Sequence, residues 1–547
     1  MEEFTIAGNI VDIVQRRIYP GTLKIKDATI VQIQLEPSTV YDRYIIPGFV
    51  DAHVHIESSM LVPSEFARYA TIHGTVATVS DPHEIGNVLG IDGVRYMIHN
   101  GSYVPFHFCF GAPSCVPATR FETAGAEITA EDIEKLFVED GLSYLSEVMN
   151  YPGVLHRDPE VMRKIEIAQR LGKRIDGHAP GLRGEEAKQY AAAGIETDHE
   201  CFSYEEAVDK IRAGMKILIR EGSAAKNYDA LIPLVEKYAD KLMFCSDDKH
   251  PDDLLRGHIN TLVRRTVKEH NVHPITALQI ATLHPVQHYG LDVGLLQIGD
   301  PADFLIVDDL YEFNVLATYI RGRKVAENGK TLLPHIEADT VNNFAAHPIQ
   351  PEVLQVPATC EHIRVIEAID GELITRENIV PAPIKKGLIV SDPKNDILKI
   401  VVVNRYADAP PAIGFIRNFG LKRGAIASSV AHDSHNIVAV GVRDEEIANA
   451  INAIIEHRGG IATALQDHTE VLPLPVAGLM ATDEGETVAK RYSSMDKFAR
   501  QTLGSSLQAP FMTLSFMALL VIPSLKLSDQ GLFNGDQFSF VKLCVET

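Results

Sequence analysis

The chain has 547 residues, which is too many for one compact core and predicts several domains. Hydrophobic residues make up 46% of the sequence and charged residues 23%, an ordinary globular composition that excludes a disordered or fibrous protein. The formal net charge of −22 disfavours a nucleic-acid-binding surface, which needs clustered Lys and Arg, and favours a small neutral or metal-bound ligand.

Cysteine usage and the chain's apolar segments indicate a cytoplasmic location. The six cysteines are scattered without a CxxC motif, which is too sparse for a disulfide framework in a chain of this size. The acidic start lacks the basic and apolar regions of a secretory signal. The longest apolar stretch, 511–525, contains polar residues and falls short of the ~20 residues that a membrane span needs. We therefore interpret it as buried core and expect no membrane segment.

The first segment, residues 4–44, consists of short β-rich runs separated by turn signals such as Tyr19-Pro20-Gly21. A later segment, 294–333, has the same character and suggests strands and a hairpin. The two flanks could pair, which predicts a small β domain built from residues 1–46 and 290–345.

Between these flanks, apolar runs that end in polar or glycine-rich turns recur eight times, at 45–55, 75–84, 104–117, 142–150, 174–180, 195–200, 216–224 and 242–248. Helical patterns separate most of them, at 130–138, 159–171, 184–193 and 228–239. Eight β/α units over roughly 240 residues predict a (β/α)8 barrel across residues 47–289. An open, doubly wound sheet is the alternative.

A proline-rich stretch, Ala346-His347-Pro348-Ile349-Gln350-Pro351, follows the second flank and is typical of a linker. New strand and helix patterns continue from it to the C-terminus. We therefore expect a third, α+β domain over residues 346–547.

Two histidines lie near the end of the first barrel strand. Because strand side chains alternate between faces, His53 and His55 point the same way and can reach one ion. The chain has 22 histidines, so an HxH spacing is expected about once by chance. The motif alone leaves metal ligands and core histidines equally open, and its place at a strand end favours ligands.

Further candidate ligands fall at the ends of later strands, where a barrel brings side chains together at one mouth. They are Glu147, His178, His199 and Asp247. With the first two histidines, they suit a pair of divalent ions bridged by a carboxylate and a hydroxide. Since no cysteine is among them, Mn, Fe or Zn is favoured over a closed structural zinc site. The alternative is a set of core histidines and helix caps.

Several segments of the chain resemble the adenine deaminase family of the amidohydrolase superfamily. HxH motifs alone would indicate only the superfamily, whereas Glu57-Ser58-Ser59-Met60 and the third domain point to this family. The resemblance covers essentially the whole chain, with its clearest segments at 47–60, 81–85, 176–178, 220–225, 432–436, 474–480 and 522–527.

The resemblance implies a binuclear site of two divalent ions, with Mn expected first and Fe or Zn as alternatives. Glu147 stands where related enzymes often carry a bridging carboxylated lysine. The implied ligands are His53, His55, Glu147, His178, His199 and Asp247. The implied reaction is hydrolysis of adenine to hypoxanthine and ammonia by a metal-bridging hydroxide that attacks C6, in purine salvage and adenine catabolism. We expect a homo-oligomer.

Other residues near the strand ends are candidates for proton transfer and substrate binding. Asp247 is the expected proton shuttle. His83 and Glu84, just beyond the second strand, could orient the base or relay a proton, although His83 could also only stabilise a turn. Substrate binding is predicted for residues after the seventh strand, with surface salt bridges as the alternative for the first two: Arg220, Glu221 and Ser223.

Strand alternation separates Asp247 from Asp248, because only one of them can comfortably face the barrel mouth. We expect Asp248 to act through loop geometry or behind the ligands. In the third domain, His432-Asp433-Ser434-His435-Asn436 is a polar cluster that we expect near the barrel mouth of its own or a neighbouring chain. A turn capped by the two histidines is the alternative.

Nucleobase deamination by a single zinc ion requires an H-x-E motif together with P-C-x-x-C. The sequence has no CxxC, so this mechanism is excluded. Two alternatives to adenine deamination remain. One is another cyclic amidohydrolase of the superfamily, since metal ligands do not choose the substrate. The other is an inactive barrel used for assembly, against which the complete ligand set argues.

Overall fold

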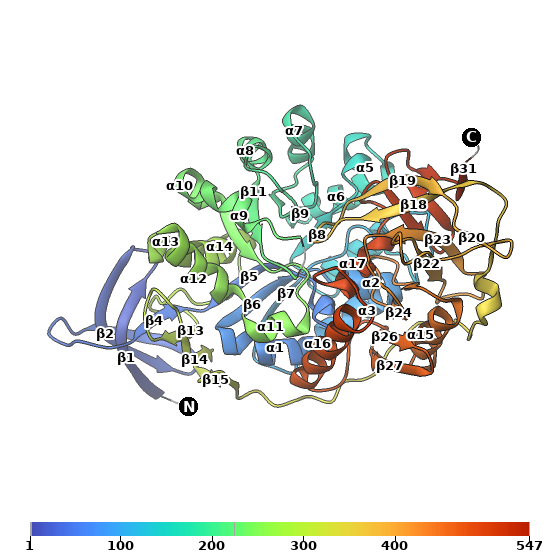
Figure 1. The fold of residues 1–547 in the computed structure, drawn as a ribbon. Coiled ribbons are helices and arrows are strands. Elements are labelled where there is room, and N and C mark those ends of the chain that lie inside the picture. Colours follow the sequence, from blue (N-terminus) through green and yellow to red (C-terminus); the bar gives the residue numbers. More distant parts are fainter. Residues whose placement is uncertain (1–2, 224, 546–547) are drawn as a thin grey trace.

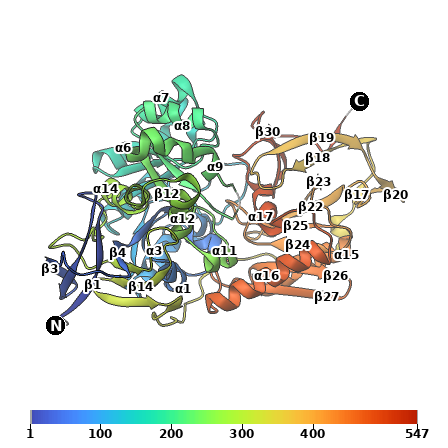
Figure 2. The same ribbon diagram turned by 60° about the vertical axis from the view of Figure 1, so that its left-hand side comes forward.

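The computed structural model describes residues 3–223 and 225–545. A sheet at one end of the molecule, a central barrel and a large mixed domain at the other end follow one another in Figures 1 and 2. This arrangement confirms the predicted fold class. The proposed limits of the three parts, 1–46 with 290–345, 47–289 and 346–547, stay a prediction that the sheet topology supports.

Strands from both flanks of the barrel form one eight-stranded sheet in the order β16-β15-β14-β13-β4-β1-β2-β3. The flanks join where β4 pairs with β1 in parallel and with β13 antiparallel. The strands are β1 (Glu3–Asp12), β2 (Arg17–Lys26), β3 (Thr29–Leu35), β4 (Tyr44–Pro47), β13 (Phe304–Val307), β14 (Val315–Ile320), β15 (Arg323–Glu327) and β16 (Lys330–Thr331).

All eight predicted barrel strands are present. They are β5 (Phe49–Val54), β6 (Thr75–Ser80), β7 (His107–Phe110), β8 (Tyr144–Val148), β9 (Arg174–Gly177), β10 (Thr197–Asp198), β11 (Lys216–Arg220) and β12 (Leu242–Cys245). Neighbours pair in parallel within β5-β6-β7, β8-β9 and β10-β11-β12.

Main-chain contacts close the gaps between these groups of strands. Ala112 bridges to Leu145, the Glu196 amide donates to the Ile175 carbonyl at 2.9 Å, and Val54 bridges to Asp247. The strands therefore form a closed ring, and the alternative of an open doubly wound sheet is wrong.

Two sequence expectations about this region needed correction. The first apolar run, 45–55, is divided at Pro47-Gly48 between β4 of the flanking sheet and β5 of the barrel. The helix predicted over 228–239 is broken into α9 (Tyr228–Leu231) and α10 (Val235–Tyr238) by a 3-10 turn that contains Pro233. A proline inside a helix removes a hydrogen bond and clashes with the preceding turn, which explains the break.

The remaining predicted helices match the structure closely. They are α4 (Ala130–Val138), α6 (Pro159–Arg170) and α7 (Gly184–Ala192). The start of α4 follows from a capping box, in which the Thr129 side chain accepts from the Asp132 amide while Asp132 reaches back to the Thr129 amide.

The third domain contains a nine-stranded sheet in the order β19-β18-β23-β22-β25-β24-β26-β27, with β31 added beside β18. Its strands are β18 (His362–Ala368), β19 (Thr375–Pro381), β22 (Leu398–Val403), β23 (Ala412–Arg417), β24 (Ala425–Ser428), β25 (Ile437–Gly441), β26 (Gly460–Leu465), β27 (His468–Pro473) and β31 (Cys544–Val545). Three helices accompany it: α15 (Asp444–Glu456), α16 (Gly485–Gln501) and α17 (Pro510–Ser515).

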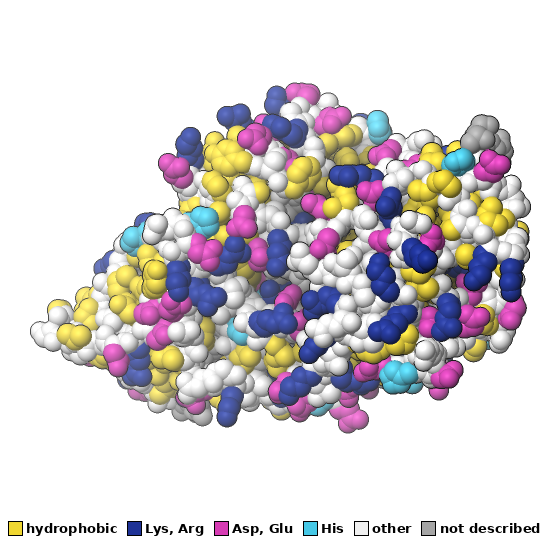
Figure 3. Space-filling view, in the orientation of Figure 1, with side chains coloured by type: hydrophobic (Ala, Val, Ile, Leu, Met, Phe, Trp, Pro, Cys, Tyr) yellow, Lys and Arg dark blue, Asp and Glu magenta, His cyan; other side chains and the backbone are white. Residues whose placement is uncertain are grey.

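The apolar stretch 511–525 is part of the core, as predicted: Phe511, Leu514 and Leu520 are buried. In the described part of the chain, no helix is long and apolar enough to cross a membrane. The face in Figure 3 carries basic and acidic side chains interspersed with one another.

One disulfide bond joins Cys360 to Cys544, with their Cα atoms 5.7 Å apart. The other four cysteines are free. The bond attaches β31 to the chain just before β18. Because 184 residues separate the two cysteines, no local spacing in the sequence could reveal the pair.

Candidate metal centre

The six predicted ligands converge at the carboxyl ends of the barrel strands. His53 lies in β5 and Glu147 in β8. His55, His178 and His199 directly follow β5, β9 and β10, and Asp247 lies two residues after β12. Five of them are fully buried and the sixth, His178, is nearly so. The convergence expected from barrel topology is therefore present.

Glu147 lies at the centre of this group. Its Oε1 is 3.3 Å from His55 Nε2, and its Oε2 is 2.8 Å from His178 Nδ1 and 3.2 Å from His199 Nε2. Asp247 Oδ1 lies 3.2 Å from His55 Nε2 and 3.4 Å from His53 Nε2. Each oxygen of Glu147 thus faces a different group of histidines, as a bridging carboxylate does.

The orientation of the imidazoles fits cation binding. His55 Nδ1 is 3.1 Å from the Asp81 carbonyl oxygen, so this nitrogen carries the proton and Nε2 presents a lone pair. The Nε2 atoms of His55 and His53 lie 3.2 Å apart. The potential ligand atoms of His53, His199 and Asp247 all lie within 4.8 Å of one another, and those of Glu147, His178 and His199 do so too. These donors fit two divalent ions.

Both central carboxylates are held ionised. Burial alone would raise the pKa of Glu147, but the imidazoles of His178, His199 and His55 outweigh it and hold this pKa well below its usual range. Burial would likewise raise the pKa of Asp247, but Arg220 and the neighbouring histidines hold it well below normal. Ionised carboxylates are the form that binds a metal.

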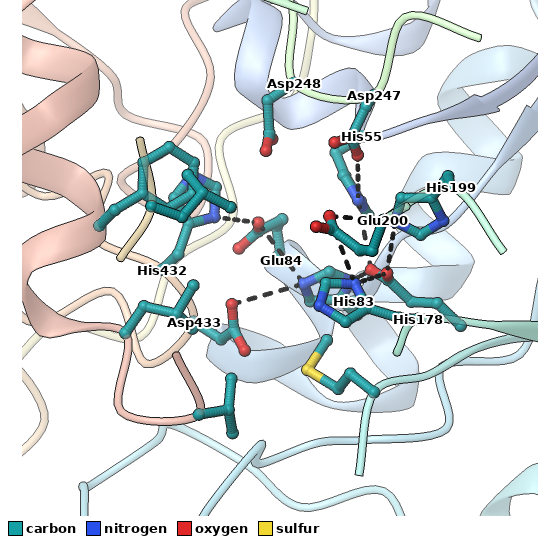
Figure 4. A pocket seen from close by; sticks show the side chains of 16 residues that line it. His55, His83, Glu84, His178, His199, Glu200, Asp247, Asp248, His432 and Asp433 are labelled. Carbon is teal, nitrogen blue, oxygen red and sulfur yellow. Dashed lines mark hydrogen bonds and ion pairs between the residues drawn. The ribbon is translucent and has the colours of Figure 1, made fainter. Parts of the chain in front are cut away.

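A small cavity opens above these residues. The barrel and the third domain both line it (Figure 4). The barrel contributes His55, His83, Glu84, Glu147, Met149, His178, His199, Glu200, Asp247 and Asp248. The third domain contributes Leu373, His432, Asp433, Phe516, Leu519 and Val521.

The two residues predicted for proton relay both line this cavity, at the start of α2 (His83–Leu89). His83 Nδ1 lies 3.1 Å from Asp81 Oδ2 and 3.2 Å from Glu147 Oε1. Glu84 forms an ion pair with His432 and also contacts His435, both of the third domain. The prediction that the His432 cluster lies near the barrel mouth is therefore confirmed, within the same chain.

The three residues predicted to bind substrate form other contacts. Glu221 pairs with Arg265 at 3.3 Å, and Ser223 Oγ donates to Asp253 Oδ2 at 2.7 Å. Arg220 is buried behind Asp247, to whose Oδ2 it donates at 2.7 Å, and it also pairs with Glu200. Of the residues that the structure describes, those lining the cavity do not include Arg220, Glu221 or Ser223. Arg220 reaches the cavity only through Asp247 and Glu200, and the role of the three residues in reading the purine edge stays a prediction.

The expected separation of Asp247 from Asp248 is also corrected. Both line the cavity, and Asp248 accepts a hydrogen bond from Ser58 Oγ. Strand β12 ends at Cys245, and Asp247 has a φ of 54°, in the left-handed region. This turn interrupts the alternation on which the expectation depended.

Two further polar residues line the cavity: Glu200, which was not predicted, and Asp433, which was expected there only as part of the His432 cluster. Glu200 lies 3.6 Å from His199 Nε2 and 3.8 Å from His178 Nδ1. Asp433 Oδ1 lies 3.7 Å from His83 Nε2. In the sequence, Glu200 could have been found only because it follows the predicted ligand His199. Asp433 could have been found only because it belongs to the His432 cluster.

Comparisons with known proteins agree with this geometry. Residues 44–325 match the amidohydrolase family, and residues 372–539 match the adenine deaminase C-terminal domain. The chain is 56% identical over 545 residues to an adenine deaminase of Salinibacter ruber, covering 99% of both chains. It is 55% identical to one of Sulfurovum sp. (98% of this chain, 99% of the relative) and 52% identical to one of Methanosarcina barkeri (98% and 99%).

Proposed function

Because the chain belongs to the adenine deaminase family of the amidohydrolases, we propose that it hydrolyses the exocyclic amine of adenine in its buried cavity, giving hypoxanthine and ammonia. The observation that carries this proposal is the group of four histidines and two carboxylates at the floor of a cavity closed by the family's C-terminal domain. The alternatives of another cyclic amidohydrolase and of an inactive barrel fit less well with relatives that match nearly the whole chain.

Two divalent ions are the proposed cofactor, with manganese expected first and iron or zinc as alternatives. When bound, such ions would lower the pKa of water and so supply a nucleophile for C6 near neutral pH. The residues that would hold them are His53, His55, Glu147, His178, His199 and Asp247.

The chain's own groups then have to move protons. Asp247, beside the histidines and ionised by Arg220, is placed to accept a proton from the attacking water and pass it to the leaving amine. Attack at C6 places negative charge on the purine ring nitrogens. His83 lines the cavity and can supply a proton or a hydrogen bond there. Burial would raise the pKa of Glu84, but the neighbouring imidazoles hold it well below its usual range, so Glu84 can orient the base as a hydrogen-bond acceptor.

We also propose a cytoplasmic enzyme of purine salvage that forms a homo-oligomer. Four of the six cysteines are free, which supports a reducing compartment, whereas the Cys360–Cys544 bond is of a kind that is rare there.

The test is to load purified protein with Mn, Fe or Zn and to assay it on a panel of purines and cyclic amides. Equal amounts of hypoxanthine and ammonia from adenine are expected. A protein that carries two metals per chain, hydrolyses a cyclic amide and leaves adenine unchanged would overturn the proposal.

A further inference from the structure

Lys526, in strand β28 (Leu525–Ser528) of the third domain, is fully buried and donates to main-chain oxygens. Its Nζ lies 2.7 Å from the Leu373 carbonyl and 2.9 Å from the Phe516 carbonyl. Burial lowers the pKa of Lys526 to about 7, and no carboxylate of the described chain opposes this effect.

A buried ammonium without a counter-ion is costly, so a position of this kind needs a reason. A lysine amine offers two N–H donors even when neutral, which is enough for the two carbonyls. The position therefore does not require a positive charge. It requires a long side chain whose N–H donors join two segments of main chain.

Both segments joined by Lys526 belong to the wall of the cavity. Leu373 comes shortly before β19, and Phe516 begins the 3-10 turn Phe516–Ala518. The side chains of both line the cavity. The Phe516 ring stacks on His432, with centroids 4.6 Å apart and planes at 11°, and His432 contacts Glu84.

This wall lies opposite the metal ligands. His432 and Asp433 of the third domain face His178 and His199 across the cavity in Figure 4. If C6 of the base sits at the metals, the flat remainder of the purine extends toward the third domain. The apolar faces of the ring then need a wall in van der Waals contact, since dispersion attraction falls steeply when a small gap separates the atoms.

We propose that Lys526 is a positioning residue for the substrate, which joins the Leu373 and Phe516 segments and so sets the apolar wall against which the purine packs. The inference deepens the proposed function and rests on it, because it takes the purine as the ligand.

The test compares Lys526→Met, which keeps the side-chain length but removes the donors, with Lys399→Met. Lys399 is the matched control: it is also buried in the third domain, but it donates to the Leu354 carbonyl and pairs with Asp444, and it does not line the cavity in the described chain. For Lys526→Met we expect KM for adenine to rise about tenfold with kcat changed less than about threefold, since binding shared by substrate and transition state is lost. Metal content should stay at the wild-type value.

Hydrogen exchange supplies a second readout. Amides in 371–376 and 512–520 should exchange faster in Lys526→Met than in the wild type. In Lys399→Met their exchange rates should be unchanged. If Lys526→Met does not fold, Lys526→Gln, whose shorter amide cannot reach both carbonyls, replaces it with the same expectations.

Three outcomes would overturn the inference: an unchanged KM in the folded variant, an equal rise in KM in Lys399→Met, or a fall in kcat that follows a loss of metal. Failure of the proposed function looks different, because wild-type protein loaded with two metals would then not deaminate adenine at all. In that case, unchanged exchange in both segments would also reject the structural role of Lys526.

Discussion

At the scale of single residues, the buried carboxylates of the cavity depend on neighbouring imidazole and guanidinium groups. Glu147 and Asp247 are almost completely buried, and isolated carboxylates would be protonated in such surroundings. The histidines around Glu147 and the guanidinium of Arg220 beside Asp247 keep both ionised. Each role can be tested by removing one charge.

Glu147→Gln is expected to lower metal content below two per chain and to lower turnover, because a neutral amide cannot bridge two cations comparably. Elemental analysis beside the adenine assay measures both. A variant that kept full metal content and full rate would show that Glu147 is only a buried strand residue.

Asp247→Asn is expected to fold normally and to lose about 10²–10⁴-fold in kcat, the usual contribution of a positioned proton-transfer group. Asp248→Asn should retain much more activity, although Asp248 also lines the cavity, because its contact is with Ser58 rather than with the histidines. Both variants are assayed after metal reloading. Equal losses would mean that the proton shuttle has been assigned to the wrong aspartate.

Arg220→Leu is expected to lower the free energy of unfolding by about 3–5 kcal/mol, because it leaves Glu200 and Asp247 buried without their partner. Denaturant unfolding measures the loss. The control Arg265→Leu removes a partly exposed arginine with surface ion pairs and should cost about 1 kcal/mol or less. A stable Arg220→Leu protein with only a raised KM would instead support the prediction that Arg220 binds the substrate.

At the scale of secondary structure, local chemistry explains particular element boundaries. Thr129 and Asp132 set the start of α4, and Pro233 divides the helix predicted over 228–239. The main addition made by the structure is a link between distant elements: the Cys360–Cys544 bond attaches the final strand β31 beside the start of β18.

Cys544→Ser is expected to lower the unfolding free energy by about 2–4 kcal/mol, because the bond restricts the unfolded chain. Thermal unfolding with and without reductant measures this effect. Reductant should lower the Tm of the wild type to that of the variant and leave the variant unchanged. An unchanged wild-type Tm would show that the two thiols are not joined in solution.

At the scale of the whole molecule, the cavity exists because the third domain closes the barrel mouth. Glu84 of the barrel lies between His432 and His435, which follow β24 of the third domain. The position of a barrel residue at the start of α2 thus depends on side chains almost 350 residues later in the chain.

His432→Ala is therefore expected to lower kcat about tenfold or more with metal content retained, because Glu84 loses a partner that orients it. His468→Ala, which removes an exposed histidine of the same domain, is the control and should leave kcat unchanged. Full activity in His432→Ala would show that the contact between the two domains only stabilises the fold.

The sequence alone determined the barrel, the pairing of the flanks and the position of all six candidate ligands. These features follow from local periodicity and from strand ends, because a closed parallel barrel brings every strand's carboxyl end to one mouth. Only the tertiary structure decided that Arg220 supports Asp247, that Asp248 also faces the cavity, and that Lys526 joins the Leu373 and Phe516 segments of its far wall. These contacts join residues far apart in the chain or depend on turns beyond a strand end, where the alternation of side chains no longer applies.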